Sequence, residues 1–288
     1  MATPLTADKL LAALRAEGVK VIEYKSWRTH NRNSRGAWGP VNGVMIHHTA
    51  STGTAASVDL CYDGYAGLPG PLCHGVVDKS GTVYMVGHGR ANHAGSGDRA
   101  VLDRLIAETP PYKPTVNNTD GNARMYGFEA VNLGDGKDPW PEAQLDAIER
   151  VSAAICRAHG WTAGSVLGHL EWQRGKVDPR GFDMTTMRER VERRLKVSPG
   201  ARPAAPRFEP FPGADFFRRY PRSPIVTAMG RRLVAEGCSA YAQGPGPQWT
   251  VADKNSYAKW QRKCGFTGAD ADGWPGRVSW DRLKVPKV

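Results

Sequence analysis

The sequence lacks several features that would assign it to a class at once. No apolar run approaches the roughly 20 residues that cross a membrane, and the first ten residues have no basic segment followed by an apolar core, as a secretory signal has. No tight run of Lys and Arg or known motif indicates a nucleic-acid site. The five cysteines show no Cys-x-x-Cys spacing, which argues against a structural zinc site made of thiolates. We therefore expect no membrane or nucleic-acid partner and synthesis in a cytoplasm, where thiols stay reduced.

Positive charge is in excess. The chain has 39 Lys and Arg against 28 Asp and Glu, a formal net charge of +11. Such an excess favours a polyanionic partner. Without a nucleic-acid motif, the acidic polymers of a cell wall are the candidate, and the alternative is that the charge only aids solubility. The length of 288 residues favours two domains.

One short stretch, residues 43–50, combines an apolar strand with a pair of histidines. In an extended strand Val44 and Ile46 point to one side, and Met45 and His47 point to the other. A buried strand that ends in histidine places an imidazole at the rim of a sheet, where a metal can bind. For an isolated histidine pair, a core strand that merely ends in histidine is the more common explanation.

A second stretch, residues 168–179, changes that balance because it supplies His169 and Asp178 after another short apolar run. Two neutral imidazoles and one carboxylate form the three-ligand set of a catalytic zinc site whose fourth position is open to water. We predict a zinc ion bound by His47, His169 and Asp178. His48 is the alternative to His47 as a ligand.

Together these stretches resemble the zinc-dependent N-acetylmuramoyl-L-alanine amidases, whose fold is shared with peptidoglycan recognition proteins. The family pattern is an apolar strand with His-x-Thr, a later Gly-His-x-Glu, and an Asp or Cys before Pro-Gly or Pro-x-Gly. It matches residues 47–49, 168–171 and 178–181, and the resemblance spans roughly residues 41–195. It implies an α/β fold with a central mixed sheet flanked by helices. It also implies hydrolysis of the amide between N-acetylmuramic acid and L-alanine by zinc-activated water.

Two further residues are expected to have catalytic roles. Glu129, in a predicted strand at residues 126–131 that resembles the family's Ile-Gly-Ile-Glu, is the expected general base and later acid. Lys176 is expected to stabilise the oxyanion, with a solvated loop lysine as the alternative. Some members place a tyrosine near the water, but this chain has Cys73 at that position.

Three other residues are expected beside the site, in contact with substrate or with a metal ligand. Thr49 follows the histidine pair and is expected to orient a ligand or substrate. His74 opens a predicted hairpin at residues 74–86. His93 belongs to a His-Ala-Gly segment that borders the substrate groove in the family, although a loop histidine is an equal alternative.

Periodic apolar residues and helix-stop glycines predict the elements around these motifs. The predicted helices are residues 7–17, 101–108, 141–159, 185–196, 224–236 and 252–264. The predicted strands are residues 19–24, 43–47, 74–78, 82–86 and 126–131. Residues 52–72, rich in glycine, are predicted as loop.

The chain is predicted to contain an amidase domain at residues 1–197, a Pro/Ala-rich linker at 198–206, and a small helical domain at 207–288. In the last domain Trp260-Gln261 and Asp272-Gly-x-x-Gly276 resemble small peptidoglycan-binding modules. Its tryptophans offer flat faces for sugar rings, although some are expected in the core. They are Trp249, Trp260, Trp274 and Trp280.

The expected protein is a monomeric phage endolysin whose partner is bacterial peptidoglycan. It would remain in the host cytoplasm until a separate membrane-permeabilising protein gives it access to the wall. Two alternatives are a peptidoglycan-recognition protein without activity and a zinc endopeptidase that cuts the stem peptide. The complete His/His/Asp set favours an enzyme, since relatives that only bind typically lose a ligand.

Overall fold

The computed structural model describes residues 2–203 and 207–288, and the chain divides into two compact units, Met1–Pro203 and Ala204–Val288. The predicted linker at 198–206 falls at this boundary, and its last three residues lie outside the described residues. Its first part is held by the first unit, because Arg194 donates a hydrogen bond to the carbonyl of Ala201 at 3.4 Å. Within the described ranges, no helix is both long and apolar enough to cross a membrane.

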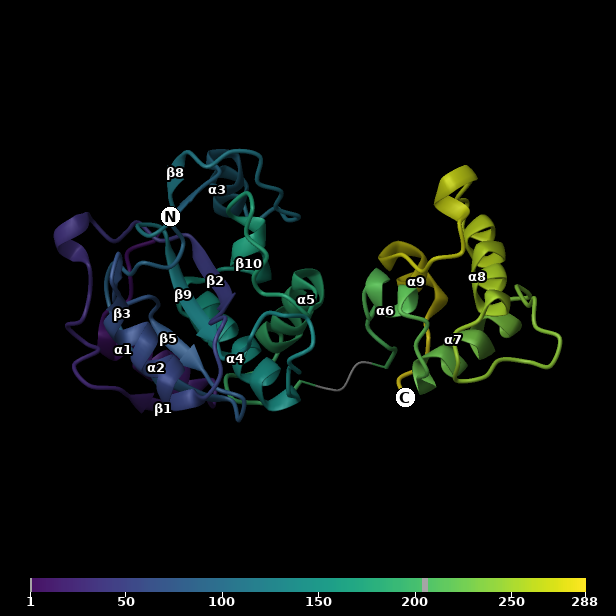
Figure 1. The fold of residues 1–288 in the computed structure, drawn as a ribbon, viewed down its shortest axis with the longest axis horizontal. Helices are drawn as coiled ribbons and strands as arrows, with labels where there is room; N and C mark the ends of the chain where they lie inside the picture. The colour runs from purple at the N-terminus through teal and green to yellow at the C-terminus, as the bar shows by residue number, and fades with distance from the viewer. Residues whose placement is uncertain (1, 204–206) are drawn as a thin grey trace. The chain divides into compact units, whose positions relative to one another are not determined.

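A six-stranded mixed sheet forms the centre of the first unit (Figure 1), in the order β1-β6-β5-β9-β2-β10. β5 and β6 pair antiparallel as the predicted hairpin, and every other neighbouring pair is parallel. The strands are β1 (Lys20–Glu23), β2 (Gly43–His48), β5 (Gly75–Val77), β6 (Thr82–Met85), β9 (Met125–Ala130) and β10 (Val166–Gly168). Two small pairs add β3 (Gly64–Tyr65) with β4 (Leu68–Pro69), and β7 (Ser96–Gly97) with β8 (Thr119–Asp120).

Helices flank the sheet, and the alternation predicted for the first histidine strand is confirmed. Val44 and Ile46 pack into the larger core with three helices, α1 (Ala7–Ala16), α4 (Glu142–His159) and α5 (Met184–Leu195). Met45 joins a separate cluster with Leu167 and α3 (Arg99–Ile106). Burial of both faces explains why this strand is apolar at successive positions. The structure thus confirms a mixed α/β fold with a central sheet flanked by helices.

The loop predicted at residues 52–72 is wrong, because the structure has a ten-residue helix there, α2 (Thr54–Asp63). It buries Ser57, Val58 and Cys61, which provide only a narrow apolar stripe, and it ends at Gly64 with φ of +73°. The glycines that follow the helix explain why the sequence pattern predicted a loop. The described residues also form four short 3-10 helices: η1 (Asn33–Arg35), η2 (Ala163–Ser165), η3 (His169–Glu171) and η4 (Gly268–Ala271).

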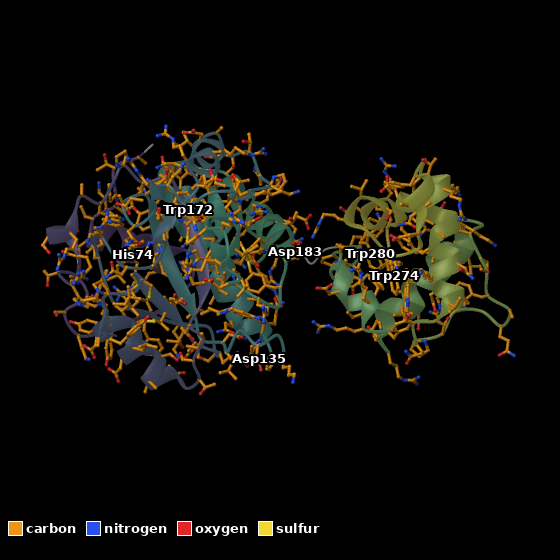
Figure 2. The ribbon with its side chains drawn as sticks, turned by 45° about the horizontal axis from the view of Figure 1, so that its top comes forward. His74, Asp135, Trp172, Asp183, Trp274 and Trp280 are labelled. Atoms are coloured by element: carbon orange, nitrogen blue, oxygen red, sulfur yellow. The ribbon has the colours of Figure 1, made fainter. Side chains whose placement is uncertain are left out.

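The second unit consists of short helices around an aromatic core. They are α6 (Ala214–Arg218), α7 (Pro224–Ala235), α8 (Val251–Lys263) and α9 (Arg277–Leu283). Trp249, Trp260 and Trp280 are buried in this core, as expected for Trp260. Trp274, labelled with Trp280 in Figure 2, is half-buried and stacks on Trp249. Most of the tryptophan surface therefore fills the core and is not available to a sugar.

Candidate metal and catalytic site

The parallel strands β2, β9 and β10 bring the sequence-predicted site residues to one edge of the sheet. His47 on β2 pairs in register with Glu129 on β9. Gly168, the last residue of β10, pairs with Ile46, so His169 follows beside the end of β2. Because parallel strands run in one direction, residues at their carboxyl ends become neighbours although they are far apart in sequence.

His47, His169 and Asp178 form a buried cluster. The Nδ1 atoms of the two histidines are 3.1 Å apart, and Asp178 Oδ2 lies 2.9 Å from His47 Nδ1 and 3.1 Å from His169 Nδ1. Over the described part of the chain, this is the group of three His, Cys, Asp or Glu side chains whose spacing suits a metal ion. Ligands about 2.0–2.2 Å from a tetrahedral zinc lie about 3.3–3.6 Å apart, so the donor atoms are within about half an ångström of the spacing that zinc requires.

The ionisation states of the cluster suit a cation. Burial lowers the pKa of His47 to about 4, against the opposing effect of Asp178, so the imidazole is neutral at pH 7. Burial alone would raise the pKa of Asp178, but the adjacent His169 and His47 rings outweigh it and hold the pKa well below its usual range. The group therefore presents the neutral imidazole of His47 beside a carboxylate, and both are forms that bind metals.

His48, the alternative ligand, lies outside the cluster. Its Nδ1 accepts a hydrogen bond from the backbone N–H of Arg180 at 3.1 Å, and its ring packs on the backbone of Gly134. This histidine therefore joins the end of β2 to two loops of the site.

Glu129 is mostly buried, with 15% of its side chain exposed, and its Oε1 lies 3.9 Å from His47 Nδ1. Among the described residues its other oxygen, Oε2, is buried and has no hydrogen-bond partner. Burial, followed by the effects of Cys61 and Asp178, raises the pKa of Glu129 well above its usual value. A buried carboxyl group with a raised pKa beside the cluster is a candidate to hold and release a proton during a reaction.

Lys176 and Thr49 lie near the cluster in different ways. The exposed Lys176 partly opposes the burial that raises the pKa of Glu129, so its ammonium charge reaches the site. The Thr49 hydroxyl accepts from the backbone N–H of Asn132 at 3.3 Å and donates to the carbonyl of Ser51 at 3.4 Å. Thr49 therefore ties the end of β2 to the segment after β9.

His74 and His93 are both buried inside the first unit, where Figure 2 labels His74. His74 Nδ1 accepts from the backbone N–H of Gly127 at 2.9 Å, so its Nε2 donates to the carbonyl of Gly89 at 2.8 Å. Both ring nitrogens of His74 are thus engaged by backbone. His93 lies closer to the cluster, with its Nδ1 3.2 Å from His47 Nε2.

Two features of the segment after β10 escaped the sequence analysis. Glu171 forms a buried two-bond ion pair with Arg188 of α5 at 2.8 and 2.9 Å. Glu171 also accepts from the backbone N–H of Gly168 at 3.1 Å, which fixes the turn carrying His169. The side chain of Gln173 contacts the ring of His169. The position of Gln173, four residues after His169 in a turn, was the signal in the sequence that could have indicated this contact.

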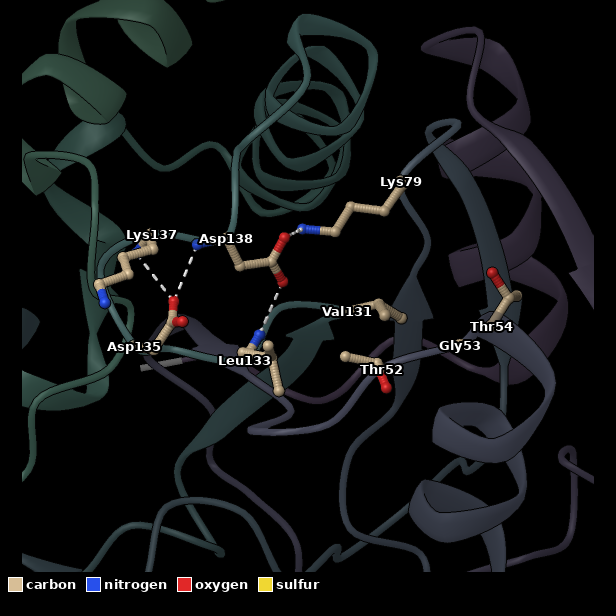
Figure 3. Close-up of a pocket in the computed structure, with 9 residues that line it drawn as sticks. All are labelled: Thr52, Gly53, Thr54, Lys79, Val131, Leu133, Asp135, Lys137 and Asp138. Carbon is tan, nitrogen blue, oxygen red and sulfur yellow. Dashed lines mark hydrogen bonds and ion pairs between the residues drawn. The ribbon is translucent and has the colours of Figure 1, made fainter.

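A pocket of about 370 Å³ opens at the same sheet edge (Figure 3). Its floor includes an ion pair between Lys79 Nζ and Asp138 Oδ1 at 2.9 Å, and Asp138 also accepts from the backbone N–H of Leu133 at 2.8 Å. The lining residues are Thr52, Gly53, Thr54, Lys79, Val131, Leu133, Asp135, Lys137 and Asp138. Several of them directly follow β2 and β9, the strands that carry His47 and Glu129.

A family model described as N-acetylmuramoyl-L-alanine amidase matches residues 37–181, which include the whole cluster and half of the chain. The chain belongs to this family. No curated protein matches the sequence.

Several solved structures are similar at a low level. The endolysin amidase LysCS from Clostridium intestinale is 18% identical, with a TM-score of 0.40 over 60% of this chain and 95% of that one. AmiD from E. coli, solved with an anhydro-muramyl tripeptide, is 16% identical, with a TM-score of 0.39 over 88% and 91%. AmpDh3 from Pseudomonas aeruginosa is 18% identical, with a TM-score of 0.37 over 92% and 96%. Family membership stands on the family model alone.

Proposed function

We propose that the first unit hydrolyses the amide between N-acetylmuramic acid and L-alanine in bacterial peptidoglycan. The observation that carries this proposal is the buried convergence of His47, His169 and Asp178 next to the unpartnered carboxyl of Glu129. The three residues would hold zinc, which when bound acts as a Lewis acid and lowers the pKa of water toward 7. Family membership supplies the substrate class.

Two side chains of the protein would supply proton transfer and stabilisation of the developing negative charge. Glu129 would accept the proton of the attacking water at a carboxyl oxygen and deliver it to the departing amine, as a general base and acid. Lys176 would place its ammonium charge where negative charge develops on the substrate oxygen. The pocket between Lys79 and Leu133 would hold one arm of the substrate, since it opens at the same sheet edge.

Identification of the new chain ends tests this reaction. Purified walls are digested, and the products are assayed for free L-alanine amines and for new reducing sugars. Amines of L-alanine without reducing sugars support an amidase. New amino ends inside the stem peptide would instead indicate the endopeptidase, and no new ends would indicate a binding protein.

We further propose that residues 207–288 bind the cell wall and that the whole protein acts as a phage endolysin. This segment carries 14 Lys and Arg against 7 Asp and Glu, a net charge of +7 that suits anionic wall polymers. Tyr220, exposed over 58% of its surface, lies against the half-buried Trp274, so one aromatic site remains for a sugar ring. Tethering would raise the concentration of the amidase unit at the wall.

Two measurements test this second part. A fragment of residues 207–288 should sediment with walls at low salt and cleave nothing, and its recovery in the supernatant would contradict the assignment. Residues 1–203 should cleave soluble muropeptides as the whole chain does but act more slowly on intact walls. For the endolysin role, expression in the host should cause lysis only when a membrane-permeabilising protein is present.

A further inference from the structure

Each histidine of the cluster has a second ring nitrogen, and the partner of that nitrogen determines where the ring carries its proton. His169 Nε2 lies 3.0 Å from Gln173 Oε1. An amide oxygen only accepts hydrogen bonds, so His169 Nε2 holds the proton. The lone pair of a neutral His169 ring is therefore on Nδ1, the atom that faces Asp178.

His47 reaches the same state through a second histidine. His93 Nε2 lies 3.3 Å from the carbonyl oxygen of Met125, which can only accept, so His93 Nε2 holds a proton and His93 Nδ1 is an acceptor. His47 Nε2, 3.2 Å from that Nδ1, must then be the donor. The lone pair of His47 is thus on Nδ1, directed toward His169 and Asp178.

His93 is held firmly enough to act in this way. The side-chain oxygen of Asn122 accepts the backbone N–H groups of His93, Ala94 and Gly95 at 3.0, 2.8 and 3.2 Å. On the other side, a Cβ atom at Gly127 would lie 2.4 Å from His93 Nδ1, so the ring lies directly on the backbone of β9. His93 is 7% exposed, which leaves the ring little room to turn.

We propose that His93 and Gln173 are positioning residues that fix the tautomers of His47 and His169 and thereby set the metal affinity of the site. The inference depends on the proposed metal site but assigns roles that the reaction itself does not require. Neither residue would touch metal or substrate. Loss of such a partner typically weakens metal binding by about 10–100-fold.

The test for Gln173 is the zinc Kd of the full-length protein, measured by competition with a chromophoric chelator. Gln173→Leu removes the acceptor and should weaken zinc binding about 10–100-fold. Gln173→Glu offers a carboxylate, which raises the basicity of the imidazole, so zinc should bind more tightly than in the wild type. Substitutions of similar size with opposite effects cannot be explained by packing. Arg174→Leu, at the next and exposed position, is the control and should leave the Kd unchanged.

The test for His93 compares two replacements in the same assay. His93→Phe keeps a ring without nitrogens and should weaken zinc binding about 10–100-fold. His93→Gln can still accept from His47 and donate to the Met125 carbonyl, so its Kd should stay within a few-fold of wild type. His88→Gln, a histidine that contacts the carbonyl of Leu5 away from the cluster, is the control.

The outcomes separate this inference from the proposed function. Wild-type protein that binds no zinc would overturn the metal site itself. If wild type binds zinc but both Gln173 variants shift the Kd in the same direction, or neither shifts it, the role of Gln173 is wrong. A His93→Gln variant about 10-fold or more weaker than wild type, or a folded His93→Phe variant that binds like wild type, would remove His93 from the role.

Discussion

Buried polar side chains differ between the two units in whether their hydrogen bonds are satisfied within the unit. In the second unit, Gln261 of α8 donates to the carbonyl of Trp274 at 2.9 Å and accepts from the backbone N–H of Gly273 at 2.7 Å. Ser279 of α9 donates to the carbonyl of Gly276 at 2.9 Å. In the first unit, acceptor atoms of His47, His169 and Asp178 face one another, and among the described residues the Glu129 Oε2 atom has no partner.

This difference separates structural from functional polar groups. A buried polar atom without a hydrogen-bond partner costs about 1–3 kcal/mol of stability. Several such atoms at one place therefore indicate a site where a ligand supplies the missing partners. The resemblance to wall-binding modules in the second unit rests on Gln261 and the Asp-Gly loop, and their bonds are closed within the unit. Those residues therefore stabilise the second unit, and the wall ligand proposed for it would contact other side chains.

Removal of a cluster histidine should give the largest effect. His169→Ala should lose tight zinc binding and reduce wall hydrolysis to background, because two ligands do not complete the proposed site. The purified variant should still unfold cooperatively, and its zinc content is measured directly. His48→Ala, outside the cluster, is the matched control and should keep zinc. A His169→Ala protein with full zinc and activity would show that the cluster is structural.

Glu129→Gln should come next in size. The amide has nearly the shape of the carboxyl but cannot exchange the proton, so zinc content should hold while turnover falls about 10²–10⁴-fold. The measurement is kcat on a soluble muropeptide together with metal analysis. Turnover within a few-fold of wild type would place the base elsewhere.

The sequence was sufficient for the parts of this site that depend on local patterns. Strand alternation correctly placed Val44 and Ile46 opposite Met45, and the two motifs named the three residues that the fold brings together. This worked because parallel strands carry their carboxyl-terminal residues to one edge whatever the length of chain between them.

Other features depend on contacts that no local pattern encodes. The role of Gln173 depends on the orientation of the His169 ring, which in turn depends on Asp178. The burial of three tryptophans in the second unit depends on how its short helices pack, since a tryptophan can serve a core or a sugar equally well. The helix α2 was missed because its apolar stripe is narrow.

Gln261 tests the role of the satisfied hydrogen bonds in the second unit. Gln261→Leu should leave the Gly273 N–H and the Trp274 carbonyl without partners and lower the free energy of unfolding of the second unit by about 2–3 kcal/mol. Hydrolysis of a soluble muropeptide should not change. Urea unfolding followed by tryptophan fluorescence gives the stability, with Gln243→Leu at an exposed position as the control. An equally stable Gln261→Leu variant would mean that closed networks in this unit are dispensable.

Asp98 gives the smallest expected effect and shows a closed network within the first unit. It caps α3 by accepting from the Ala100 N–H at 2.8 Å, and its other oxygen accepts from the Thr115 and Val116 N–H groups at 2.6 and 3.2 Å. These bonds, that from Thr115 above all, outweigh burial and lower the pKa of Asp98 to about 2. Asp98→Asn places an amide NH₂ against N–H donors, so the variant should lose about 2 kcal/mol of stability at pH 7.

The pH dependence of that loss has a defined sign. The unfolded pKa of an aspartate is about 3.9, above the folded value of about 2, so the stabilisation by Asp98 is complete above about pH 5. It should decline as the pH falls through 4 toward 2, because the unfolded chain then binds the proton first. Asn does not titrate, so the gap between wild type and Asp98→Asn should narrow over that range. Urea unfolding of zinc-free protein between pH 7 and pH 3 measures it, with the exposed Asp103→Asn as control. A gap that stays constant with pH would show that the Asp98 cap acts through shape and not through charge.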